Sequence, residues 1–121
     1  MCRNFELSIS YVGETTLKAV KVGICGLGTV GSGTFNVLTQ NAQDITRRAG
    51  REIIIQQVGA RRDNPAADTS NIDITRDIFE VATNPEIDVV VELIGGYDVA
   101  KKLVLLAIEN GKHVVTANKA L

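Results

Sequence analysis

Apolar residues fall into two alternating patterns along most of the chain. Short runs rich in valine and isoleucine, bounded by glycine or polar residues, are typical of buried parallel strands. Between these runs, apolar residues recur at every third or fourth position, which is the spacing of one face of a helix. The runs predict strands over residues 19–25, 53–60, 87–94 and 113–117.

The segments between these strands predict three helices. A long helix covers residues 30–49, and Gly50 follows it at a position where glycine commonly ends a helix. A short helix is capped by Thr75 and ended by Asn84 and the proline after it. The third helix covers residues 98–110.

The alternation of strands and helices determines the expected fold class. Consecutive strands are expected to be parallel and joined by right-handed crossovers, which predicts an α/β protein with a doubly wound, mainly parallel sheet. Residues 1–17 show neither pattern and are predicted to be a weakly structured extension. Residues 18–121 are predicted to form one domain.

Length, charge and cysteine content narrow the class of protein. A chain of 121 residues suits one domain, and a net charge of −1 gives no basic surface for nucleic acid or an anionic membrane. No apolar run approaches the length of about 20 residues that a membrane-spanning helix needs. Two cysteines, Cys2 and Cys25, do not make a disulfide framework. We therefore expect a cytoplasmic domain without nucleic-acid or membrane partners.

A glycine motif joins the first predicted strand to the first predicted helix. Residues 26–31 read G-L-G-T-V-G, and their place after a strand and before a helix is the context that supports a dinucleotide-binding loop. Gly26 is expected to permit the tight turn, Gly28 the approach of a pyrophosphate, and Gly31 the close packing of helix on sheet. The alternative is a tight turn that binds no ligand.

Main-chain amides in the same loop are candidate pyrophosphate donors. Leu27, Thr29 and Val30 lie beside the predicted start of the helix, where the helix dipole favours a phosphate group. The loop and its context therefore predict a Rossmann-like nucleotide-binding domain.

The end of the second predicted strand bears on the choice of cofactor. An acidic side chain there would accept hydrogen bonds from the 2′-hydroxyl of NAD, whereas arginine would pair with the 2′-phosphate of NADP. This chain has Arg61, Arg62 and Asp63 in that order. The arginines favour NADP, or tolerance of both cofactors, and Asp63 keeps NAD open. The alternative is an exposed pair of loop charges.

Three segments resemble the nucleotide-binding domain of homoserine dehydrogenase: VKVGICGLGTVGSGTFNVL, VGARRDN and VVVELIGGYDVAKKLVLLAIENGKHVVTANKAL. The ELIGG and TANKAL blocks are more specific to that family than the glycine loop is. The resemblance implies NADP(H)- or NAD(H)-dependent interconversion of L-homoserine and L-aspartate 4-semialdehyde, in the biosynthesis of threonine, methionine and isoleucine. It also implies a homo-oligomeric parent enzyme with a further domain for substrate binding and dimerisation, which we expect to be missing from this chain.

The resemblance also implies roles for single residues. Arg61 matches the position that faces the 2′-phosphate in NADP-using members. Lys119 matches a lysine beside the nicotinamide and the substrate, with Thr116 and Asn118 as neighbouring cofactor contacts. Lys119 follows a predicted strand at the sheet edge where such folds bind ligands, although a solvated lysine is the alternative. The main proton donor is expected outside this chain, so Lys119 is a contact first and a catalytic group second.

Other residues near this edge have two open interpretations. Gly95 and Gly96 would let the nicotinamide ribose approach the backbone, or they form a plain turn. Glu92 lies in an apolar strand, where an unpaired carboxylate is costly, so it either supports the site or contacts the ligand. His113 is predicted to be a surface or capping residue, and Cys25 to be buried packing. No metal-ligand cluster is visible.

Two functions from different classes fit the sequence. The first is the cofactor domain of homoserine dehydrogenase, which would bind cofactor but lack activity alone. The second is a stand-alone module that binds NAD(P)H for regulation or redox sensing. Lys119 and Asn118 favour the enzyme, because a sensor has no need of a lysine that faces the substrate.

Overall fold

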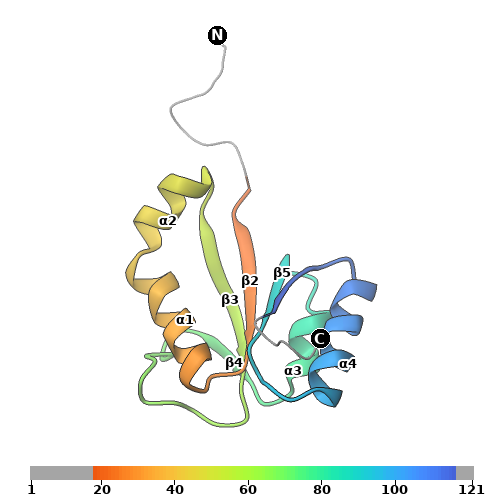
Figure 1. The fold of residues 1–121 in the computed structure, drawn as a ribbon. Helices are drawn as coiled ribbons and strands as arrows, with labels where there is room; N and C mark the ends of the chain where they lie inside the picture. The colour runs from red at the N-terminus through yellow and green to blue at the C-terminus, as the bar shows by residue number, and fades with distance from the viewer. Residues whose placement is uncertain (1–17, 117–121) are drawn as a thin grey trace.

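The computed structural model of the chain describes residues 18–116, which form a parallel five-stranded sheet covered by helices on both faces (Figure 1). The strand order is β4-β3-β2-β5-β6, and each neighbouring pair is parallel. The strands are β2 (Val20–Cys25), β3 (Ile53–Gly59), β4 (Asp73–Thr75), β5 (Val89–Glu92) and β6 (His113–Thr116). This arrangement confirms the predicted doubly wound α/β class.

Two helix layers pack on opposite faces of the sheet (Figure 1). On one face, Phe35 of α1 packs with Ile24 and Val58 in a buried cluster. On the other face, Val81 of α3 and Leu103 of α4 pack in a second cluster. The helices are α1 (Thr29–Gln40), α2 (Ala42–Ala49), α3 (Ile78–Thr83) and α4 (Asp98–Glu109). Strand β2 lies in the middle of the sheet and contributes to both cores because its side chains alternate between the faces.

The long helix predicted over residues 30–49 is in fact two helices, so that prediction was wrong. Asn41 lies between them with a non-helical backbone, and its side-chain amide donates to the Val37 carbonyl at 3.1 Å. Asparagine side chains compete with the backbone for such carbonyls, which is why this residue favours helix ends. The predicted end holds, because Gly50 adopts a φ of 75° directly after α2.

The segment before α3 also differs from the prediction. Thr75 is not the helix cap: it is the last residue of β4, a short strand that the sequence pattern did not reveal. The cap is Asp77, whose carboxylate accepts a hydrogen bond from the Phe79 amide at 3.0 Å. The predicted third strand is shorter than expected, because only Val89–Glu92 pairs with its neighbours.

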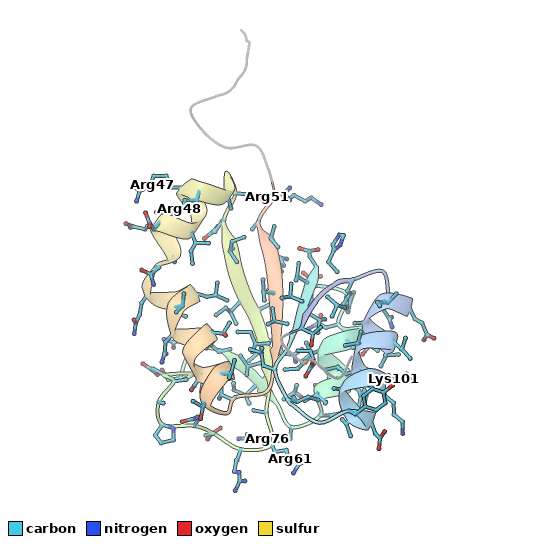
Figure 2. The ribbon with its side chains drawn as sticks, in the orientation of Figure 1. Arg47, Arg48, Arg51, Arg61, Arg76 and Lys101 are labelled. Carbon is cyan, nitrogen blue, oxygen red and sulfur yellow. The ribbon has the colours of Figure 1, made fainter. Side chains whose placement is uncertain are left out.

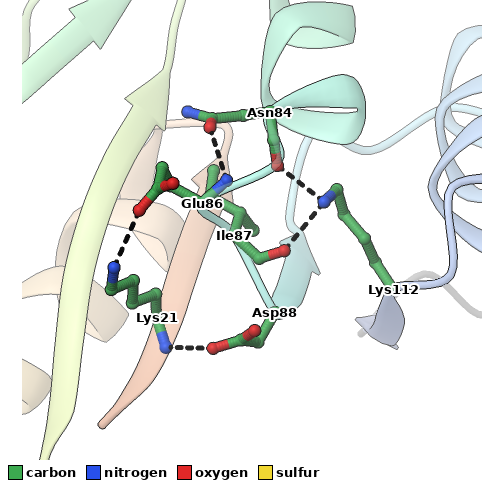
Figure 3. A network of polar contacts seen from close by, with 6 residues as sticks. All are labelled: Lys21, Asn84, Glu86, Ile87, Asp88 and Lys112. Carbon is green, nitrogen blue, oxygen red and sulfur yellow. Dashed lines mark hydrogen bonds and ion pairs between the residues drawn. The ribbon is translucent and has the colours of Figure 1, made fainter.

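The end of the sheet where the strands begin is held by a network of charged side chains (Figure 3). Lys21 pairs with Glu86 at 2.9 Å through its ammonium, and its amide donates to the Asp88 carboxylate at 2.9 Å. The Lys112 ammonium donates to the carbonyl oxygens of Asn84 at 2.6 Å and Ile87 at 2.8 Å. These contacts fix the turn between α3 and β5 against the strands on either side of β5.

Candidate nucleotide-binding site

The glycine loop leaves β2 and enters α1 at the end of the sheet where the strands finish. Gly26 has a φ of 105°, which side chains rarely adopt, and its amide donates to the Gly59 carbonyl at 2.7 Å. A Cβ at Gly31 would overlap the carbonyl oxygen of Gly26. This geometry agrees with the turn and packing roles expected of these two glycines.

Gly28 stands in a different environment from the other two glycines of the motif. A Cβ at this position would meet nothing within 4 Å, so the side that lacks it faces open space and not protein. Gly28 is also the N-cap of α1, without a side-chain cap, and the first turn of α1 carries no acidic residue. The positive end of this helix therefore has no acidic side chain in its own first turn, which is an arrangement that can bind an anion.

An open cleft of about 930 Å³ lies over the carboxyl ends of β2, β3 and β5. In an open parallel sheet, this end of the strands is where ligands bind. The cleft is lined by backbone of the glycine loop, charged residues after β3, the start of α3 and the loop after β5. The lining residues are Gly26, Leu27, Gly28, Gly59, Ala60, Arg61, Arg62, Asp63, Asn64, Pro65, Arg76, Asp77, Ile78, Phe79, Leu93, Ile94, Gly95, Gly96, Tyr97, Asp98 and Val99.

The cleft therefore contains most, but not all, of the residues predicted to bind a cofactor. Gly26, Leu27, Gly28, Arg61, Arg62, Gly95 and Gly96 line it. Thr29, Val30 and Gly31 form the first turn of α1 next to the lining residues, and Val30 is exposed. Thr116 ends β6, one strand further along. Asn118 and Lys119 lie outside the described residues, and so does the extension predicted over residues 1–17.

Arg76 is a cleft residue that sequence reasoning missed. Its guanidinium donates to the Ala60 carbonyl at 3.1 Å and pairs with the Asp63 carboxylate at 2.7 Å. Figure 2 shows Arg61 and Arg76 at the same end of the molecule, away from the arginines near α2. Only pairing of β4 with β3 brings Arg76 to this place, and that strand was not predicted.

Asn64 is a second residue that the sequence did not single out. Its side-chain amide donates to the Leu27 carbonyl at 2.8 Å and thereby ties the loop after β3 to the glycine loop. Asn36 of α1 extends this connection by donating to the Ala66 carbonyl at 2.8 Å. The position of the glycine loop thus depends on contacts that are distant in sequence.

Glu92 is completely buried where β5 meets the cleft. One carboxylate oxygen accepts a hydrogen bond from the Ile94 amide at 2.9 Å, and the other accepts one from the Thr116 hydroxyl. Glu92 therefore contacts the loop that follows β5. Neighbouring Cys25 is also buried, and burial, together with the charge of Glu92, raises the pKa of its thiol to about 12. Cys25 is packing, as predicted.

Neither a metal-binding cluster nor a membrane-spanning helix is present in the part of the chain that the structure describes. Residues 18–116 contain no group of three or more His, Cys, Asp or Glu side chains placed to hold a metal ion. No helix among the same residues is long and apolar enough to cross a membrane. His113 is exposed at the start of the edge strand β6.

Together, the parallel sheet, the glycine loop at a helix start and the cleft at the strand ends define a dinucleotide-binding domain of the Rossmann type. A family model described as "Homoserine dehydrogenase, NAD binding domain" matches residues 26–121. The chain therefore belongs to the family of homoserine dehydrogenase NAD-binding domains. The resemblance found in the sequence is confirmed, a nicotinamide dinucleotide is supported as the cofactor, and the stand-alone sensor is not favoured.

Similar proteins agree with this assignment. The chain is 72% identical over 105 residues to homoserine dehydrogenase from Pseudomonas aeruginosa and 57% identical over 107 residues to that from Methylobacillus glycogenes. Each match covers 87% of this chain but only 24% and 26% of the relatives. A crystal structure of a homoserine dehydrogenase from Thiobacillus denitrificans, 54% identical, matches 84% of this chain and 24% of its own with a TM-score of 0.76. The chain thus spans about a quarter of the length of these relatives.

Proposed function

We propose that this chain is the NADP(H)-binding domain of a homoserine dehydrogenase, which interconverts L-homoserine and L-aspartate 4-semialdehyde. The observation that carries the choice of NADP is the pairing of Asp63 with Arg76. The glycine loop also supports the proposal, because it lies beside a cleft at the carboxyl ends of the strands that arginine side chains help to line.

The charges after β3 favour a phosphate group. Asp63 is the side chain that would recognise the 2′-hydroxyl of NAD, but its carboxylate already accepts a hydrogen bond from Arg76. Arg61 and Arg62 line the same end of the cleft. Together with Arg76, they give this end three guanidinium groups, whereas the carboxylate of Asp63 is already paired. Asp77 also lines the cleft, and its carboxylate is engaged as the cap of α3. Guanidinium groups bind phosphate oxygens through paired, charge-assisted hydrogen bonds.

The chain's own residues would hold the remaining parts of the cofactor. The backbone from Gly26 to Gly28 and the first turn of α1 would bind the pyrophosphate, because no acidic residue repels it there. Gly95 and Gly96 would let the nicotinamide ribose approach the loop after β5. The nicotinamide ring supplies hydride acceptance and donation when bound. Lys119 would contact the substrate carbonyl oxygen, with the main proton donor in another part of the enzyme.

The same proposal implies a substrate, a biosynthetic role, a compartment and an oligomeric state for the parent enzyme. The parent enzyme would act on a small-molecule substrate in the biosynthesis of threonine, methionine and isoleucine. It would work in the cytoplasm as a homo-oligomer, without nucleic-acid or membrane partners. The 121-residue chain alone would bind cofactor and show no oxidation of homoserine, because the substrate domain is expected elsewhere.

Titration with both cofactors tests the choice of NADP. The 121-residue chain is expected to bind NADPH more tightly than NADH, as followed by the fluorescence of the reduced nicotinamide. Arg61→Ala should weaken NADPH about tenfold, since it removes a charge-assisted hydrogen bond, and should leave NADH unchanged. Arg76→Ala should also weaken NADPH about tenfold, but it releases the Asp63 carboxylate and should therefore tighten NADH.

Arg47→Ala is the matched control, because Arg47 is an exposed arginine on α2 that pairs with its helix neighbour Asp44, at the opposite end of the molecule from Arg61 and Arg76 (Figure 2). It should change neither affinity. Equal losses of NADPH and NADH in the Arg61 and Arg76 variants would remove these residues from a 2′-phosphate site. Homoserine oxidation by the purified chain would contradict the need for a further domain.

A further inference from the structure

Glu92 is a buried acidic group that the proposed binding scheme does not use. Its side chain is fully inaccessible to solvent, in a strand whose other residues are all valine. Within residues 18–116, no lysine or arginine forms an ion pair with it. Burying a carboxylate is costly, and hydrogen bonds to both of its oxygens offset part of that cost.

These hydrogen bonds join the end of β6 to the loop that follows β5. Glu92 and Thr116 lie side by side in the register of β5 and β6. The Thr116 hydroxyl donates to one carboxylate oxygen of Glu92, and the Ile94 amide donates to the other. A single side chain therefore ties the end of β6 to the loop that follows β5.

Both segments lead to residues predicted to contact the nicotinamide half of the cofactor. Ile94 opens the cleft-lining loop that contains Gly95 and Gly96, whose φ values are 74° and 75°. Glycines with such backbones restrict the loop little by themselves, so its position depends on anchors at its ends. Thr116 precedes Lys119 by three positions in the sequence.

We infer that Glu92 is a positioning residue that holds the nicotinamide side of the cleft in its binding arrangement. This inference rests on the proposed function, because it assigns a role within the same cofactor site. A carboxylate suits the task because its two oxygens accept hydrogen bonds in different directions at once. Glutamine can keep both contacts: its carbonyl accepts from the Ile94 amide, and its amide group donates to the Thr116 hydroxyl.

The test compares two ligands that differ only at the nicotinamide end. NADPH and 2′-phospho-ADP-ribose, which lacks the nicotinamide, are titrated into the 121-residue chain and its variants by calorimetry. Glu92→Ala should weaken NADPH about tenfold, the effect of losing charge-assisted hydrogen bonds, and should change 2′-phospho-ADP-ribose by less than about twofold. Glu92→Gln should restore NADPH binding to within about threefold of the native chain.

A second variant covers the case in which Glu92→Ala does not fold. Thr116 is exposed, so Thr116→Val should fold, and it should weaken NADPH selectively because it removes one of the two contacts. Leu103→Ala is the control for lost stability, since Leu103 is fully buried in the core beneath Glu92's strand and does not line the cleft. It should lower the melting temperature and leave the ratio of the two affinities unchanged.

Three results would overturn the inference. Equal losses for both ligands in Glu92→Ala and Thr116→Val would show a merely structural role. Unchanged NADPH binding in a folded Glu92→Ala variant would show that the anchor is not needed. Failure of the native chain to bind either ligand would instead contradict the proposed function, and this inference with it.

Discussion

The two ends of the parallel sheet are built from different chemistry. Where the strands begin, Lys21 and Lys112 donate hydrogen bonds to residues of the turn between α3 and β5 (Figure 3). Where the strands finish, a cleft of about 930 Å³ remains open beside the glycine loop. The comparison indicates that one end stabilises the fold and the other end is left for a ligand.

The largest expected effect is a loss of cofactor affinity with no loss of stability. Gly28→Val should weaken NADPH and NADH by at least about 100-fold, because its side chain would occupy the path of the pyrophosphate. The fold should survive, since Gly28 has a φ of −75° and a Cβ there meets nothing within 4 Å. Titration should show the loss, while the melting temperature should stay within about 2 °C of the native value.

Gly31→Ala is the contrasting variant from the same motif. Its Cβ would overlap the Gly26 carbonyl oxygen, so α1 would have to move away from the loop. We expect this variant to lose about 1–3 kcal/mol of unfolding free energy as well as cofactor affinity. If Gly28→Val were as unstable as Gly31→Ala, or bound cofactor normally, the assignment of Gly28 to the pyrophosphate would be wrong.

A substitution at the end of the sheet where the strands begin should lower stability and leave cofactor affinity unchanged. Lys112→Met keeps most of the length of the side chain but removes the two hydrogen bonds to Asn84 and Ile87. The expected loss is about 1–2 kcal/mol of unfolding free energy, measured by chemical denaturation, with NADPH affinity unchanged. A loss of cofactor affinity comparable to that of Gly28→Val would show that the two ends do not act separately.

The smallest effect concerns pH and the Lys21–Glu86 pair. The hydrogen bond and the charge of Lys21 lower the pKa of Glu86 below its ordinary value of 4.5, and Glu86 in turn raises the pKa of Lys21 above 10.5. The pair therefore contributes its stability between these two values. That contribution is lost as the pH falls through the lowered pKa of Glu86, or rises through the raised pKa of Lys21.

Melting curves of the native chain and Glu86→Gln measure this contribution. The difference between them should be small at neutral pH, as expected for an exposed pair, should begin to shrink as the pH falls below 4.5, and should vanish below the lowered pKa of Glu86. NADPH affinity should not change. A difference that persists in acid would assign the effect to packing and not to the ion pair.

The sequence was sufficient for features that rest on local patterns. Valine-rich strands, the glycine loop and the left-handed Gly50 follow from neighbouring residues, and all of them lie where they were predicted, although the third predicted strand is shorter than expected. The family resemblance rested on local blocks in the same way. Predictions for Asn118 and Lys119 stay predictions, because these residues lie outside the described range.

Features that depend on contacts between distant residues were missed. Strand β4 has three residues, too few to show a period, and it is defined by its pairing with β3. Arg76 reaches Asp63 only through that pairing, so the state of the Asp63 carboxylate could not be inferred from its neighbours. Asn41 was hidden for another reason: the apolar spacing continues across it, while its backbone is non-helical.

The buried thiol of Cys25 gives the domain an internal reporter of its own opening. With a pKa of about 12, the thiol is almost wholly protonated at neutral pH, and the closed sheet keeps alkylating reagents away from it. Labelling of Cys25 therefore requires β2 to separate from its neighbours, so the labelling rate measures the free energy of that local unfolding. A ligand held by the glycine loop, which begins at the next residue, would slow this labelling in proportion to its affinity.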